Sequence, residues 1–252
     1  MNSKANIVFL SERQSQLPAS CQNCMKRPLC PVLDLLAQSA GNPGGSVAMK
    51  TYHSNEAVIE AGQPFNGLYM VRSGFFKSSF IDDSGELQVT GFHFPGEIFG
   101  LEGIESGRYG DTVVALDTGS LCRVPFALPQ TGTTPARQQD ANTTAALMTL
   151  VRLMSGTLAR DRNMLFNLGR MDASRRFATF LLDIGRRMQT SGFDSSNFKL
   201  CMSRIDIANY LCLALETVSR LFTQFHTQGL IEVDRRELRI VDRAALEAIA
   251  RA

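Results

Sequence analysis

Four cysteines could bind a metal, three of them close together near the start of the chain. Cys21, Cys24 and Cys30 form a C-x2-C-x5-C run, and Cys122 lies far from them in sequence. Four thiolates are the ligands of a 2Fe-2S or 4Fe-4S cluster, and a structural zinc site takes the same number. The spacing therefore indicates a metal centre but leaves iron-sulfur and zinc both open.

The remaining cysteines and the histidines carry weaker signals. Cys201 and Cys212 lie in apolar surroundings, so we expect them to be small buried hydrophobic residues. His53, His93 and His226 are isolated, and we assign them no ligand role. In a reducing cytosol, six cysteines favour metal or redox chemistry over a disulfide framework.

The C-terminal region predicts a winged helix-turn-helix. Ser203 and Asp206 have the spacing of a capping box that opens a helix over 204–210, and a turn at 211–214 leads into a second helix from Leu215. Gly229 closes the second helix. Residues 230–242 then predict two short strands around a charged turn at 234–237, the expected wing.

The second helix of this motif is amphipathic. Its apolar residues share one face, and the opposite face is polar, with Glu216, Ser219, Arg220 and Thr223. In the major groove of DNA, an arginine can bond guanine in bidentate fashion and a carboxylate can accept from cytosine. We predict that this face reads DNA, the alternative being an ordinary surface helix.

Between residues 47 and 128 the pattern is typical of an antiparallel β-sandwich or barrel. Short apolar or alternating runs are separated by turn residues such as those at 82–85. The predicted strands cover residues 57–59, 67–71, 75–81, 87–94, 113–116 and 120–124.

A long helix follows residues 129–145, which we interpret as a linker or a frayed helix start. Its apolar residues recur at spacings of four and three, the heptad pattern of a helix that pairs with an identical helix. The predicted dimer interface consists of Leu147, Val151, Met154, Leu158, Asp161 and Leu165, with Leu168 continuing the series. A further helix is predicted over 173–188 and a short strand over 198–201.

Asp161 is the exception in this seam. In a symmetric pair it would face its own copy, and two like charges would weaken the dimer. The alternative is that the helices have splayed apart at this point and leave Asp161 in water.

Composition excludes several classes of protein. The 252 residues carry a net charge of +2 and are 44% hydrophobic, and no uninterrupted apolar stretch is long enough to span a membrane. We therefore expect a cytoplasmic protein without a membrane partner. Residues 152–187 contain an excess of arginine. The sequence has no recognisable nucleophile-base set, phosphate loop or paired acids, so we expect no enzymatic activity.

The segment MSRIDIANYLCLALETVSRLFTQFHTQGLI resembles the DNA-binding domain of the CRP/FNR superfamily, and the ETVSR run is its specific part. The likeness extends over most of the chain and implies an α+β fold in four parts. These are an N-terminal cysteine arm (1–45), an antiparallel β-roll like the cyclic-nucleotide-binding jelly roll (46–128), a linker and long dimerisation helix (129–170) and a C-terminal winged helix-turn-helix (171–252).

Resemblance to the FNR-type branch implies a regulator that responds to oxygen. It implies that Cys21, Cys24, Cys30 and Cys122 hold an oxygen-labile 4Fe-4S cluster, and that Leu29 shields it. The cluster-bound homodimer would bind palindromic TTGAT-type DNA sites through Glu216, Ser219 and Arg220, and oxygen would convert it to a monomer that releases DNA.

The acidic turn at 82–86 lies where relatives contact RNA polymerase. RNA polymerase is therefore an expected partner, although a solvated hairpin turn would have the same composition. The segment at 131–144 looks longer than in relatives, which leaves the link between Cys122 and the dimerisation helix open.

Two other functions stay open at this point. A cyclic-nucleotide-responsive regulator like CRP would use the same roll, with a Gly-Glu pair and an Arg-Ser pair for ribose and phosphate. Gly96 and Glu97 are present, but Thr112 and Val113 stand in place of the second pair, so the phosphate would lack its arginine. A constitutive DNA binder with a zinc-stabilised cysteine arm is the third hypothesis.

Overall fold

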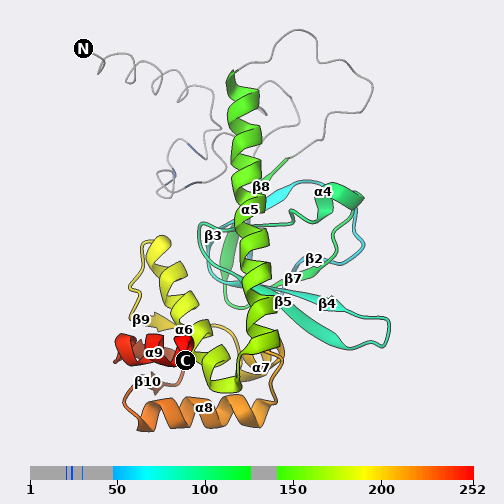
Figure 1. Cartoon of the computed structure of the whole chain (residues 1–252). Helices are drawn as coiled ribbons and strands as arrows, with labels where there is room; N and C mark the ends of the chain where they lie inside the picture. The colour runs from blue at the N-terminus through cyan, green and yellow to red at the C-terminus, as the bar shows by residue number, and fades with distance from the viewer. Residues whose placement is uncertain (1–20, 22–23, 25–29, 31–47, 126–140) are drawn as a thin grey trace, which may run out of the picture.

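The computed structural model describes Cys21, Cys24, Cys30 and residues 48–125 and 141–252, with the backbone alone for 141–146. The described chain consists of a β-roll, a long helix beside it and a helical C-terminal domain with a small sheet (Figure 1). The predicted α+β fold is confirmed.

The roll contains two four-stranded antiparallel sheets, with strand orders β1-β8-β3-β6 and β2-β7-β4-β5. The predicted strands are present, whereas β1, β6 and the short helix α4 were not predicted. The elements are β1 (Ala48–Tyr52), β2 (Ala57–Ile59), β3 (Leu68–Ser73), β4 (Phe76–Ile81), β5 (Leu87–His93), β6 (Ile98–Phe99), α4 (Gly103–Ser106), β7 (Thr112–Ala115) and β8 (Gly119–Val124).

Strand β3 shows how the roll divides its apolar residues between two clusters. Tyr69 and Val71 point into the core between the two sheets, whereas Leu68 and Met70 point to the outer side. All four side chains are buried. Because both faces of β3 are covered, a second element must pack on the outer side of its sheet.

That element is helix α5 (Ala141–Arg170), which runs along the roll (Figure 1). Leu150 and Leu153 of α5 pack against the outer cluster that contains Leu68, Met70 and Cys122. Residues 141–145, predicted as a linker or a frayed helix start, belong to α5, and residues 129–140 lie outside the described residues.

The C-terminal domain places four helices and a three-stranded sheet around one apolar core. Phe177 of the first helix contacts Phe222 and Phe225 of the third, with ring centroids 4.7 and 5.3 Å apart. The elements are α6 (Ala173–Thr190), β9 (Asn197–Lys199), α7 (Arg204–Tyr210), α8 (Leu215–Thr227), β10 (Ile231–Asp234), β11 (Glu237–Ile240) and α9 (Arg243–Arg251). All but α9 were predicted.

The capping box predicted from the sequence opens α7. The Ser203 hydroxyl accepts a hydrogen bond from the Asp206 amide at 3.1 Å, and the Asp206 carboxylate accepts one from the Ser203 amide at 3.1 Å. Two otherwise unsatisfied amides at the start of α7 are thereby bonded.

None of the helices within the described ranges combines the length and the apolar character that a membrane span requires.

Two helical glycines make a matched test of this packing. A Cβ at Gly185 would lie 2.5 Å from the Ser195 carbonyl oxygen, whereas one at Gly169 would meet nothing within 4 Å. We expect Gly185→Ala to destabilise the protein by about 1–3 kcal/mol through overpacking. Gly169→Ala should stabilise it by about 0.5–1 kcal/mol, because alanine loses less backbone entropy in a helix. Urea unfolding followed by circular dichroism measures both, and equal effects would contradict the packing described.

Candidate functional site

Helix α8 presents a polar face to solvent. Glu216, Arg220 and Thr223 are exposed, Ser219 is half-buried, and Val218 on the opposite face is fully buried. The Thr223 hydroxyl donates to the Ser219 carbonyl oxygen at 3.2 Å. The predicted residues therefore do share one accessible face, and its donors and acceptors match those that read base edges in the major groove.

The wing adds two candidate DNA contacts that were not predicted from the sequence. Strands β10 and β11 pair from Ile231–Ile240 to Asp234–Glu237 and leave a tight turn at their tip. Arg235 and Arg236 form this turn and are exposed. Two adjacent arginines in a turn are a readable signal, because arginine in such loops can bond backbone phosphates.

Cys122 occupies the centre of the outer sheet of the roll. It lies on β8 with Met49 of β1 on one side and Met70 of β3 on the other, and it is 8% exposed. Its side chain is in the cluster that Leu150 and Leu153 of α5 cover. Cys122 therefore links the roll to the long helix.

The structure brings two of the N-terminal cysteines to this same cluster. Cys21 and Cys30 pack against the residues around Cys122, and the Cys30 thiol donates to the Met70 sulfur at 3.4 Å. The Cys24 amide donates to the Cys21 carbonyl oxygen at 3.3 Å, so the first two cysteines belong to one turn. Leu29 lies outside the described residues.

The electrostatics of Cys122 depend on the other cysteines. Burial raises the pKa of the Cys122 thiol, nearby Cys21 and Cys24 raise it further, and Arg72 acts in the opposite direction. Thiolates brought together in an apolar site would repel one another, and a cation that binds sulfur would relieve this repulsion.

The donor chemistry fits a soft metal. Four thiols without a carboxylate or water-rich shell suit an iron-sulfur cluster or zinc rather than magnesium or calcium. Among the described residues, however, no three His, Cys, Asp or Glu side chains lie close enough to hold a metal ion in their present positions. The residue types therefore fit the cofactor, whereas the sulfurs are not gathered into a ligand cage.

The predicted dimer seam of α5 is exposed. Leu158 is 70% and Leu165 71% exposed, and Leu147, Val151 and Met154 are each about half exposed. Met148 and Phe166, which are also exposed, flank the seam and were not predicted. An apolar strip this wide along one helix is typical of an interaction surface.

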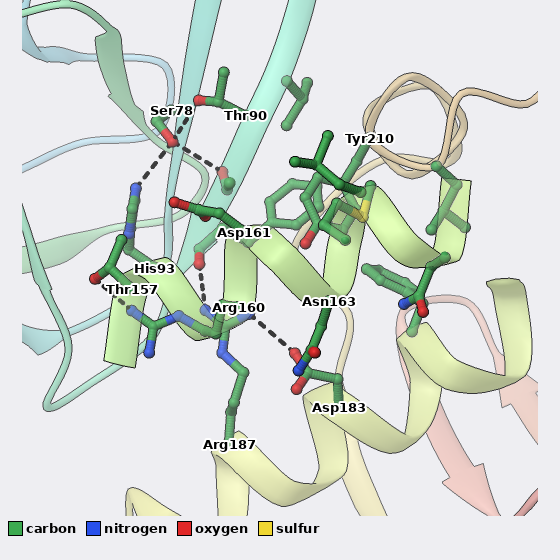
Figure 2. Close-up of a pocket in the computed structure, with 18 of the residues that line it drawn as sticks. Ser78, Thr90, His93, Thr157, Arg160, Asp161, Asn163, Asp183, Arg187 and Tyr210 are labelled. Carbon is green, nitrogen blue, oxygen red and sulfur yellow. Dashed lines mark hydrogen bonds and ion pairs between the residues drawn. The ribbon is translucent and has the colours of Figure 1, made fainter. Parts of the chain in front are cut away.

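Asp161 lies on the wall of a pocket of about 1180 Å³ between α5, the roll and the C-terminal domain. Figure 2 shows it directed from α5 toward Thr90 and Ser78 of the roll. Asp111 lines the same pocket: burial raises its pKa, the hydrogen bond from Thr90 lowers it and the charge of Asp161 raises it. Asp161 is thus repelled by a carboxylate of its own chain.

The other cysteines and His93 have separate environments. Cys201 is 4% exposed, and burial raises its pKa to about 11, as expected of a structural cysteine. The expectation that Cys212 is buried was wrong: it is exposed, with a left-handed φ of 51° in the turn between α7 and α8. Burial lowers the pKa of His93 to about 4, so its ring is neutral near pH 7.

Glu97, which would bind ribose in a cyclic-nucleotide receptor, already forms an ion pair within the chain. Arg187 of α6 holds the Glu97 carboxylate in bidentate fashion, with nitrogen–oxygen distances of 2.8 and 2.6 Å. Arg108 is exposed and donates to the Gly62 carbonyl oxygen at 2.7 Å. This arrangement does not favour a cyclic-nucleotide site.

Two protein families match this chain, one over the roll and one over the C-terminal domain. Residues 49–127 match the cyclic nucleotide-binding domain family, and residues 175–249 match the Crp-like helix-turn-helix domain family. The fold is similar to that of FixK2 from Bradyrhizobium japonicum, with a TM-score of 0.68 and 28% identity over 82% of this chain and 98% of that chain.

Curated relatives match nearly end to end. The transcriptional activator protein anr of Pseudomonas aeruginosa is 37% identical, covering 92% of this chain and 93% of that protein. The fumarate and nitrate reduction regulatory protein of Salmonella typhi is 33% identical, covering 91% and 90%. With an exposed amphipathic helix in a winged helix-turn-helix domain that follows a cyclic-nucleotide-type roll, the chain belongs to the CRP/FNR family of DNA-binding transcription regulators.

Proposed function

We propose that this protein is an oxygen-responsive transcription regulator that binds DNA as a homodimer under anaerobic conditions. Cys21, Cys24, Cys30 and Cys122 would hold a 4Fe-4S cluster, and α8 would read TTGAT-type palindromic sites. The curated relatives include proteins named anaerobic regulatory protein from Pasteurella multocida and Haemophilus influenzae, which supports the anaerobic class.

One observation carries the proposal: the cysteines and the dimerisation helix share a single apolar cluster. Cys21, Cys30 and Cys122 pack with Leu150 and Leu153 of α5. A bound 4Fe-4S cluster would supply iron that reacts with oxygen. The positions of these cysteines then decide how firmly Leu150 and Leu153 are held against the roll.

Helix α5 connects this contact to dimerisation. Val151 and Met154, one residue beyond Leu150 and Leu153, belong to the exposed seam. A helix moves as a rigid element over a few turns, so any change at the cysteine contact changes how the seam is presented to a partner.

Asp161 would keep this dimer near balance. Its position in the heptad series would bring it near its own copy in a symmetric pair, and in its own chain it points into the pocket toward the roll, where its charge acts on Asp111. Like charges oppose association, so a modest free-energy difference at the cysteine contact is enough to shift the monomer–dimer equilibrium.

RNA polymerase would contact the acidic hairpin turn between β4 and β5. The Asp82 carboxylate accepts hydrogen bonds from the Ser84 and Glu86 amides at 2.8 and 2.9 Å, which fixes the turn in an exposed position. Phe80, Ile81 and Leu87 beside it are exposed as well and supply apolar surface for a protein partner.

The first prediction concerns the metal. Protein purified without oxygen should be brown and contain about four iron and four sulfide ions per chain. Cys122→Ser should lose both. Cys201→Ser is the matched control, since it removes an equally buried thiol from the C-terminal domain and should keep full loading. Colourless wild-type protein that contains zinc in place of iron would contradict the proposal.

The second prediction concerns Asp161. Asp161→Ala removes the charge from the seam and should tighten dimerisation in air by about tenfold or more, because like-charge repulsion is relieved. Sedimentation equilibrium measures this, and DNA binding in air should rise in parallel. Ser155→Ala, an exposed change elsewhere on α5, is the control. If dimerisation of the Asp161→Ala variant is as sensitive to oxygen as that of the wild type, the proposed role of Asp161 is wrong.

The third prediction concerns DNA reading. Arg220→Ala should weaken binding to a TTGAT-type site by about 10- to 100-fold, the worth of a bidentate contact to guanine, and leave dimerisation intact. Fluorescence anisotropy with specific and scrambled DNA measures the discrimination. Gln228→Ala changes the residue that caps the far end of α8, and it should change neither the DNA discrimination nor dimerisation. Unchanged discrimination by the Arg220 variant would reject its role.

A further inference from the structure

The roll and the DNA-binding domain are joined by direct side-chain contacts between β5 and α7. Strand β5 is the outermost strand of its sheet, so one of its edges has no neighbouring strand. Backbone N–H and C=O groups at such an edge have no strand partner, and those that another element covers need hydrogen bonds from that element. Asn209 of α7 supplies them.

The Asn209 side chain bonds this edge as another strand would. Its amide nitrogen donates to the Leu87 carbonyl oxygen at 2.7 Å, and its amide oxygen accepts from the Val89 amide at 2.5 Å. The Gln88 side chain returns a hydrogen bond to the Asn209 carbonyl oxygen at 2.9 Å. Three hydrogen bonds therefore fix the end of α7 to the roll.

An ion pair fixes the start of α7 to the neighbouring strand. Lys77 of β4 contacts Asp206 at 2.5 Å, and the two side chains are only 21% and 13% exposed. Burial raises the pKa of Asp206, but the hydrogen bonds from Lys77 and Ser203 outweigh it and the net pKa is lowered. Asp206 is thus ionised near pH 7, and it joins the capping box of α7 to the roll.

These contacts leave the reading face free. They use residues of α7, whereas Glu216, Arg220 and Thr223 of α8 stay exposed. The Phe92 ring of β5 lies 5.1 Å from the Tyr210 ring, so apolar packing continues along the same junction. The connection between α5 and α6 covers only residues 171 and 172, so the chain keeps the domain beside the end of α5, and these contacts then fix its orientation against the roll.

We propose that Asn209 and Lys77 are positioning residues that hold each reading helix at a fixed place relative to the roll, and so set the half-site spacing that the dimer accepts. This rests on the proposed homodimer, since two reading helices must be placed relative to one another. Two rigidly docked helices match half-sites about one helical turn apart and reject other separations. If the contacts with the roll were lost, the two α8 helices would accept a wider range of separations between the half-sites.

Spacing selectivity provides the test. Anaerobic wild-type protein and its variants are titrated with two duplexes that carry the same half-sites, one with the natural separation and one with about five base pairs added, half a helical turn. For Lys77→Met/Asn209→Ala we expect the affinity ratio between these duplexes to fall by about tenfold, while affinity for a single half-site and dimerisation remain unchanged.

Two further variants separate positioning from folding. Asn209→Asp keeps the size of the side chain but places a carboxylate oxygen against the Leu87 carbonyl oxygen, so it should also reduce the ratio. Lys77→Arg keeps the ion pair with Asp206 and should preserve the wild-type affinity ratio between the two duplexes. Thermal unfolding by circular dichroism verifies that each variant is folded.

The outcomes distinguish this proposal from the function on which it rests. Folded, dimeric Lys77→Met/Asn209→Ala and Asn209→Asp proteins with the wild-type spacing ratio would overturn the positioning role. Wild-type dimers that bind both duplexes equally well would overturn it too. Wild-type protein that dimerises and selects spacing without iron would instead contradict the proposed cofactor and leave the positioning role supported.

Discussion

The outer face of one sheet of the roll must be covered, and the rest of the structure depends on how this is done. Leu68 and Met70 of β3 point away from the roll core, so they need apolar partners on the other side. Leu150 and Leu153 of α5 provide part of this cover, and Cys21, Cys30 and Cys122 lie in the same cluster. The cysteines thereby contact the helix that carries the exposed seam.

The two sides of α5 have opposite requirements. One side is satisfied within the chain, whereas the other leaves an apolar strip in water that association with a second copy would bury. Asp161 interrupts this strip and lies near Asp111 of the roll. Under the proposed function, a stable contact to the roll and an incomplete contact to a partner would make the monomer–dimer balance sensitive to small changes at the cysteines.

The DNA-binding domain is held to the roll by a different set of interactions. Polar contacts from Lys77 to Asp206 and from Asn209 to the edge of β5 surround the packing of Phe92 on Tyr210. Arg187 adds a bidentate ion pair to Glu97, which occupies a carboxylate that a ribose would otherwise need. These parts of the roll thus support the C-terminal domain.

Local patterns in the sequence determined the capping box of α7, the two faces of α8 and the strands with clear alternation, because these depend on residues a few positions apart. They did not reveal β6, which has two residues, or α9. The exposure of Cys212 and the contacts of Asn209 with β5 were decided only by the tertiary structure. Those features arise where segments far apart in the chain meet, and no local periodicity encodes which surfaces come together.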